Sequence, residues 1–275
     1  MALSDIVKIS LARYRVNPIM IVPPLVAMVF PLIASLLLVP PTPKAFAPEF
    51  LSFIFMAFGV LLLNLIVSFL ALLGQASMAG RVVAEEKTRL TDWGKGIKKY
   101  SLRVLGIGLI YLGIIVVFFV LIGMIIVFAM LPQLISQLGG IVTPPTPPLT
   151  PLITPSITMA TTGVTALLMT IASAVFYMWL APAVVDDKGV FVSLDAGTKT
   201  IRKGGKAFLG FIALFFIVSA IAQMIEAFPT CLGVTIQPVC YNGCVTPTHI
   251  VSQVITTIFS PLWFLIAFTI YNKQK

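Results

Sequence analysis

Six apolar runs, each long enough to cross a bilayer as a helix, dominate this sequence. A hydrocarbon core about 30 Å thick requires about 20 helical residues. We expect the spans at residues 18–39, 50–79, 104–131, 157–181, 207–228 and 249–271. Their apolar residues lack the alternation of barrel strands, so helices are expected. The sequence therefore predicts an all-α, polytopic membrane protein, with residues 1–275 forming a single integral domain.

The composition supports this interpretation. Hydrophobic residues make up 59% of the chain and charged residues 10%, whereas soluble domains carry about 25% charged residues. Lipid must therefore cover much of the apolar surface. The net charge of +9 does not indicate nucleic acid, because the charges occur only in short segments between apolar runs. In that position they favour contacts with anionic lipid headgroups.

The basic residues are distributed very unevenly between the two sets of loops. Of the 18 lysines and arginines, all except Lys44 lie before the first span, between spans two and three, between spans four and five, or after the sixth. Cytoplasmic loops carry such an excess of basic residues. We therefore expect a multi-pass protein of the cell membrane with both termini in the cytoplasm.

Three basic segments precede successive pairs of spans. They begin near Asp5, Asp92 and Asp195, and the next span follows after 13, 12 and 12 residues. Ser, Thr and Asp at these starts offer oxygens for helix capping. We expect a threefold repeat, in which an amphipathic helix in the plane of the membrane precedes each hairpin of spans. Ordinary basic loops are the alternative.

The cations of these segments are the candidate lipid-binding residues. They are Lys8, Arg13, Arg15, Lys95, Lys98, Lys99, Arg103, Lys199, Arg202, Lys203 and Lys206.

All three cysteines fall near the predicted loop between the last two spans. The outer compartment favours oxidation, so Cys231, Cys240 and Cys244 are expected to form one disulfide and leave one thiol, with the pairing open. Free thiols and a zinc site that includes His249 are the alternatives. The spacing matches no standard zinc pattern, so no metal is expected.

Uncharged polar side chains inside the spans are the candidates for a polar path, because ionisable residues are almost absent there. These candidates are Asn64, Gln75, Gln223 and Gln253. Hydrogen bonds between packed helices are the alternative use. No catalytic residue is predicted: the chain has one histidine, and Asp186 and Asp187 on a short turn are expected to point apart and to be solvated.

One run of residues resembles a known family. The run PAVVDDKGVFVSL at 182–194 is followed by a basic segment and by Phe208-Leu209-Gly210, while Asn17-Pro18 starts the first span and Pro261 to Tyr271 ends the sixth. Together they resemble prokaryotic membrane proteins related to the membrane domain of some glycerophosphoryl diester phosphodiesterases. The resemblance implies six spans. The catalytic barrel of those enzymes has no counterpart here, so no catalytic residue is carried over.

These features lead to one preferred function and one alternative. The preferred function is a non-enzymatic, lipid-interacting scaffold or a subunit of a membrane complex. Its partners would be anionic lipids of the inner leaflet and other membrane-protein subunits, without nucleic acid and without a cofactor. The alternative is a small-molecule or lipid transporter that uses a polar path between the helices.

Overall fold

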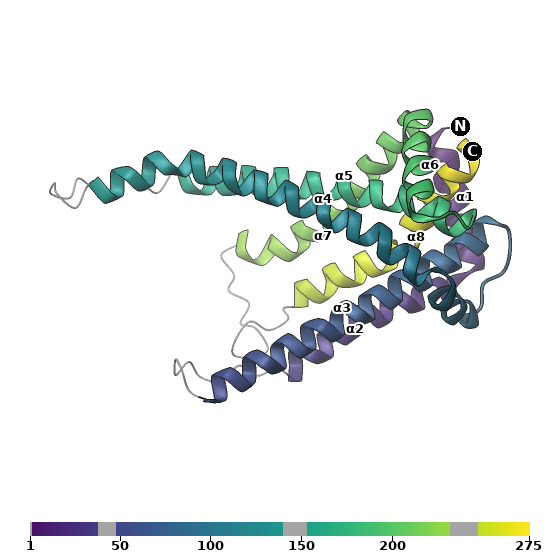
Figure 1. Ribbon diagram of the computed structural model, residues 1–275, viewed down its shortest axis with the longest axis horizontal. Coiled ribbons are helices and arrows are strands. Elements are labelled where there is room, and N and C mark those ends of the chain that lie inside the picture. Colours follow the sequence, from purple (N-terminus) through teal and green to yellow (C-terminus); the bar gives the residue numbers. More distant parts are fainter. Residues whose placement is uncertain (1, 38–47, 140–152, 232–246) are drawn as a thin grey trace.

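The computed structural model describes residues 2–37, 48–139, 153–231 and 247–275, and these residues form helices joined by short connections (Figure 1). No strand occurs in these four ranges. In chain order the helices are α1 (Leu3–Val16), the 3₁₀ helix η1 (Pro18–Ile21), α2 (Val22–Leu37), α3 (Pro48–Val83), α4 (Leu90–Gly139), α5 (Ile153–Val185), α6 (Val190–Lys203), α7 (Gly205–Cys231) and α8 (Pro247–Gln274).

Five of these helices contain segments that are long and apolar enough to cross a membrane. A sixth span is reached if α1 and the helical stretch after it count as one span, bent by 95°. The five segments are Phe55–Val83, Leu90–Leu121, Thr165–Val185, Gly205–Ile225 and Thr248–Gln274. The prediction of an all-α, polytopic membrane protein is confirmed.

The bend after α1 has a local cause. Asn17 leaves the helical conformation with φ −126° and ψ 58°, as expected for a residue before proline. Pro18 then starts η1, where its missing N–H is tolerated. The Asn17 amide fixes the bend, because Nδ2 donates to the Arg13 carbonyl at 3.0 Å and Oδ1 accepts from the Thr88 N–H at 3.1 Å. The bend is thereby tied to the α3–α4 connection.

The three basic segments are helical, but they differ in how they join the following span. The first is the separate helix α1, and the third is α6, which ends at Gly204 before α7. The second, at residues 90–103, is continuous with the apolar part of the 50-residue helix α4. The sequence explains the difference, because neither a glycine pair nor an Asn-Pro step interrupts residues 97–105.

The expected side-chain caps are wrong for two of these helices. The N-cap residues of α1 and α6 are Ala2 and Gly189, and neither makes a side-chain capping hydrogen bond. Asp92 acts from within α4 instead, where its Oδ2 accepts the N–H of Arg89 at 2.8 Å. This is the acidic half of a capping box.

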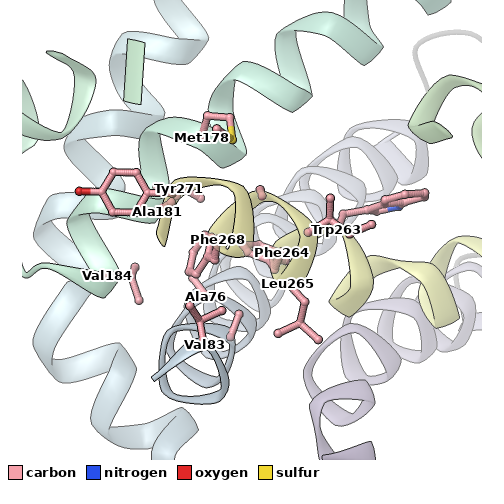
Figure 2. Packing of buried hydrophobic residues seen from close by; sticks show 14 of the residues in the cluster. Ala76, Val83, Met178, Ala181, Val184, Trp263, Phe264, Leu265, Phe268 and Tyr271 are labelled. Atoms are coloured by element: carbon pink, nitrogen blue, oxygen red, sulfur yellow. The ribbon is translucent and has the colours of Figure 1, made fainter. Parts of the chain in front are cut away.

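The densest packing lies at the end of the molecule that carries both termini, which we call the terminal end (Figure 1). Every residue of α8 from Leu262 to Tyr271 is at most 5% exposed. In Figure 2, Ala76 and Val83 of α3 and Ala181 of α5 lie around Phe268 and its neighbours on α8. From this core the long helices diverge towards the other end. α8 is therefore the central helix of the bundle.

Candidate functional site

Two features are candidates for function: cations at the terminal end, and a polar cleft between the spans. The predicted lipid-binding cations divide into two groups. Four have partners within the protein, whereas seven are exposed and form no ion pair within the described ranges. We call the seven the unpaired cations: Lys8, Arg15, Lys95, Lys98, Arg202, Lys203 and Lys206.

Large apolar side chains are exposed on the same segments. On α1, Leu11 is 40% exposed and lies between the cations Lys8 and Arg15 at helical spacing. On α6, Phe191 is 78% exposed. On α4, Leu102 is 81% exposed. A helix that combines exposed cations with exposed apolar side chains suits the boundary between lipid headgroups and acyl chains.

α1 and α6 each have one buried face. Ile6 and Ser10 of α1 are at most 2% exposed, and Ser193, Gly197 and Thr200 form the buried side of α6. The spacing of four and three residues places the three α6 positions on one face. Each helix is therefore docked on the bundle by one side and presents the other outward.

Asp186 connects the α5–α6 turn to the end of α8. Its Oδ2 accepts from the Tyr271 hydroxyl at 2.5 Å, and its Oδ1 accepts from Lys275 Nζ at 2.7 Å. Lys188 Nζ lies 3.2 Å from Oδ2 and donates to the Tyr271 hydroxyl at 3.0 Å. Partial burial alone would raise the pKa of Asp186, but the hydrogen bonds from Lys275, Tyr271 and Lys188 outweigh it and lower the pKa.

Asp187 connects the same turn to α4. Its φ of 59° is left-handed, a conformation that Asp tolerates better than most residues. Its carboxylate accepts a hydrogen bond from Arg103, and Lys99 Nζ lies 3.3 Å away. The hydrogen bond from Arg103 is the main cause that lowers the pKa of Asp187. The two carboxylates contact different helices. The side chain of Asp187 is 49% exposed, as expected for a solvated carboxylate, whereas that of Asp186 is 19% exposed and is less solvated than expected. Sequence reasoning missed the contacts that both make with other helices.

Arg13 and Lys199 complete the group of partnered cations. Arg13 donates to Thr269 Oγ1 at 3.3 Å and lies 3.6 Å from Glu85, so it joins α1 to α8 and to the α3–α4 connection. Lys199 pairs with Asp195 one turn away at 2.7 Å. Sequence reasoning assigned these cations to lipid because their partners, Asp195 excepted, lie far away in the chain.

Asp92 is a buried charge that sequence reasoning did not single out as an ion-pair partner. It is 3% exposed, and its Oδ1 lies 2.6 Å from Arg81 Nη1. Ser77 Oγ donates to the Asp92 carbonyl at 3.2 Å, and Trp93 Nε1 donates to the Leu70 carbonyl at 2.8 Å. These bonds fasten the first turns of α4 to the last turns of α3. The helix-start pattern Thr91-Asp92 was the signal available in the sequence.

A polar cleft of about 280 Å³ lies between α2, α3, α5 and α8. Gln75 and Ser260 hydrogen-bond to each other within it: Gln75 Nε2 lies 2.9 Å from Ser260 Oγ, and that hydroxyl lies 3.1 Å from Gln75 Oε1. Gln253 lines the same cleft. The other lining residues are Pro24, Ala27, Met28, Ser68, Ala71, Leu72, Tyr177, Thr256 and Thr257.

Two of the four predicted polar-path residues thus share one cleft, and two do not. Asn64 is also on α3, but it does not line the cleft, and its Oδ1 is buried without a hydrogen-bond partner among the described residues. Gln223 is exposed on α7, away from the cleft. The structure therefore assembles Gln75 with Gln253 and leaves Asn64 and Gln223 outside.

The predicted cysteine site lies outside the described side chains. Cys231 ends α7, but its side chain and all of Cys240 and Cys244 lie outside the described residues. The disulfide stays a prediction. Within the described ranges, no group of three or more His, Cys, Asp or Glu side chains is placed to hold a metal ion.

A second cavity, of about 190 Å³, lies between α4 and α5. Its lining is almost entirely apolar and includes Phe118, Phe119, Leu168 and Trp179. It differs from the polar cleft, which carries the hydrogen-bonding groups.

Comparisons with protein-family models, curated proteins and solved structures found no match to this chain. The resemblance drawn from residues 182–194 therefore stays a prediction.

Proposed function

We propose that this protein is a non-enzymatic, multi-pass scaffold or complex subunit of the cell membrane, which binds anionic lipids of the inner leaflet. Both termini would lie in the cytoplasm. One observation carries the proposal: the unpaired cations and the exposed residues Leu11, Leu102 and Phe191 occur together on the three basic segments.

The physical basis is the placement of these helices at the headgroup layer. Each Lys or Arg near an anionic surface contributes about 1 kcal/mol to binding, and this contribution decreases as salt increases. Exposed apolar side chains such as Phe191 add burial in the acyl boundary. The partnered cations Arg13 and Arg103 would contribute less, because they already interact with groups inside the protein.

The test compares two triple variants of the full chain in nanodiscs that contain phosphatidylserine and phosphatidylcholine. The first changes Arg202, Lys203 and Lys206 to Gln, which removes three unpaired cations. We expect native mass spectrometry to show phosphatidylserine binding weakened by up to about 100-fold, corresponding to about 1 kcal/mol per cation.

The control variant changes Lys99, Arg103 and Lys199 to Gln, which removes the same charge from partnered positions. Its effect on phosphatidylserine binding should be much smaller. Equal losses in both variants would mean that net charge acts at a distance, and no loss in the first would remove the lipid-binding role. Copurification from the native membrane tests the scaffold role separately, since a scaffold retains a stable partner subunit.

A small-molecule or lipid transporter is the second candidate, and the polar cleft favours it. The cleft has amide and hydroxyl groups between apolar spans, supplied by Gln75, Ser260 and Gln253. Polar groups inside a membrane bundle are costly unless they have a use, such as contact with a transported substrate. Reconstitution in liposomes with an uptake screen tests this candidate. Loss of uptake in Gln75→Leu with retained uptake in Gln223→Leu would support it, because only Gln75 lines the cleft.

We also propose, from the sequence pattern at residues 182–194 alone, a relationship to the membrane domain of the glycerophosphoryl diester phosphodiesterases. The structure adds a reason for that pattern to persist in related chains, because Asp186 and Asp187 each fasten a different helix. An alignment of related chains that varies freely at both positions would count against the relationship.

A further inference from the structure

The polar cleft is closed on one side and open on the other. Gln75 and Ser260 form its floor through their mutual hydrogen bonds. Directly after Ser260, α8 enters the dry core, where Leu262 to Tyr271 are at most 5% exposed. In the opposite direction the helices diverge (Figure 1), and Gln253 lies about 10 Å from Ser260 along α8, at 1.5 Å per residue.

The lining of the cleft includes amide and hydroxyl groups but carries no Asp, Glu, Lys, Arg or His. A charged ligand would lose hydration here and gain no opposite charge. Amide and hydroxyl groups both donate and accept hydrogen bonds, which matches a ligand that does the same. An uncharged group with hydroxyls is therefore the best chemical fit.

Two polar groups on α8 residues that line the cleft lack a usual hydrogen-bond partner among the described residues. The side-chain amide of Gln253 makes no hydrogen bond with any described residue, whereas Gln75 is satisfied by Ser260. Pro261 within α8 has no N–H, so the Thr257 carbonyl lacks its usual partner four residues later. Unmet polar groups inside a membrane bundle are costly, and a bound hydroxyl-bearing group would satisfy them.

The remaining wall of the cleft is apolar. Ala27 and Met28 of α2 and Leu72 of α3 face the same space as Gln253 and Thr256. Such a mixed wall fits a molecule with a polar head and an apolar chain.

We propose that the polar cleft binds an uncharged, hydroxyl-bearing group, carried either by a neutral lipid or by a free polyol. Gln253 donates and accepts at the head of this ligand, and Tyr177 lies beside it. The inference goes beyond both proposed functions, because binding in the cleft requires neither the unpaired cations nor transport.

The test uses the full chain in phosphatidylcholine nanodiscs and two lipids that differ only by a phosphate, dioleoylglycerol and dioleoyl phosphatidic acid. Phosphatidic acid would also bind at the unpaired cations, so the quantity compared is the part of each lipid's binding that depends on Gln253. In native mass spectrometry, dioleoylglycerol should show this dependence and phosphatidic acid should not. Gln253→Leu should weaken dioleoylglycerol binding about three- to tenfold, the effect of losing one hydrogen bond or two. The matched control Gln223→Leu changes the same residue type outside the cleft and should leave binding unchanged.

A second variant covers the case in which Gln253→Leu fails to fold. Tyr177→Phe keeps the ring contacts with Phe215 and Phe264 and removes only the hydroxyl, so the fold is preserved and binding should weaken in the same direction. Free glycerol at millimolar concentration identifies the source of the group. If it displaces dioleoylglycerol and binds alone, the ligand is a free polyol; if it does not, the ligand is a neutral lipid.

Either of those results supports the cleft as a binding site. The proposal is overturned if Gln253→Leu weakens the binding of phosphatidic acid as much as that of dioleoylglycerol. It is also overturned if Gln253→Leu and Tyr177→Phe both bind like the unchanged protein, or if neither dioleoylglycerol nor glycerol binds at all.

Discussion

The contact between α3 and the start of α4 makes a sharp prediction about two glycines that lie two residues apart. A Cβ added at Gly96 would lie 2.3 Å from Ser77 Cβ and 2.5 Å from Ser77 Oγ. Ser77 cannot turn away freely, since it is 6% exposed and its hydroxyl donates to the Asp92 carbonyl. A Cβ added at Gly94 would meet nothing within 4 Å.

The magnitudes follow from two opposing effects. Gly→Ala inside a helix favours folding by about 1 kcal/mol at either position, because alanine loses less backbone entropy. At Gly96 the overpacking costs about 1–3 kcal/mol, and the very short contact places it at the upper end. We therefore expect Gly94→Ala to stabilise the protein by up to about 1 kcal/mol and Gly96→Ala to destabilise it by about 1–2 kcal/mol.

Thermal unfolding of both variants in the same detergent, followed by tryptophan fluorescence, measures the difference. The double variant Ser77→Gly with Gly96→Ala removes the obstructing side chain and should recover part of the loss. Melting temperatures that rise for both single variants, or no recovery in the double variant, would show that α3 and α4 do not approach as closely as the structure indicates.

Three further predictions concern the polar groups of the terminal end. Asp92→Asn should lower the free energy of unfolding by about 2 kcal/mol, as chemical unfolding would measure, because Arg81 loses a buried partner but stays partly exposed. The pKa of Asp186 is lowered in the folded protein, so its stabilising contribution is present above the ordinary carboxyl pKa and is lost as pH falls through the lowered value. Hydrogen exchange of the backbone amides in the last turn of α8, corrected for the intrinsic effect of pH, should therefore become faster in acid, and Asp186→Asn should show the faster exchange already at neutral pH. Ser10 is fully buried and its hydroxyl has no partner among the described residues. Ser10→Ala should therefore raise the free energy of unfolding by about 1 kcal/mol, which a higher melting temperature would show.

The spans were predictable because lipid imposes a length and an apolar composition that twenty consecutive residues reveal. The ends of the helices were less predictable from the sequence. α3 continues to Val83 and α4 begins at Leu90, beyond the apolar runs predicted at 50–79 and 104–131. Hydropathy marks only the lipid-covered part of a helix, while backbone hydrogen bonds continue through polar residues such as Lys98 and Tyr100.

The roles of individual cations were not predictable from their positions. Arg103 and Asp187 are 84 residues apart, and Arg13 and Thr269 are 256 apart. A sequence shows that a cation lies near a membrane boundary, but it does not show whether a distant carboxylate or hydroxyl already satisfies it. The same limit applied to Gln75, which was recognised as a polar residue inside a span without its partner Ser260, 185 residues away.

The course of α8 explains why lipid binding and cleft binding can coexist in one small bundle. Pro261 stands between Ser260 at the floor of the cleft and Leu262 at the start of the dry core. The part after Pro261 packs against α1, α3 and α5 and supports the segments that carry the unpaired cations, while the part before it lines the cleft. A ligand in the cleft therefore contacts a different part of α8 from the one that holds the basic segments. Transport across the membrane would require the core after Pro261 to open, whereas lipid binding at either end would leave it closed.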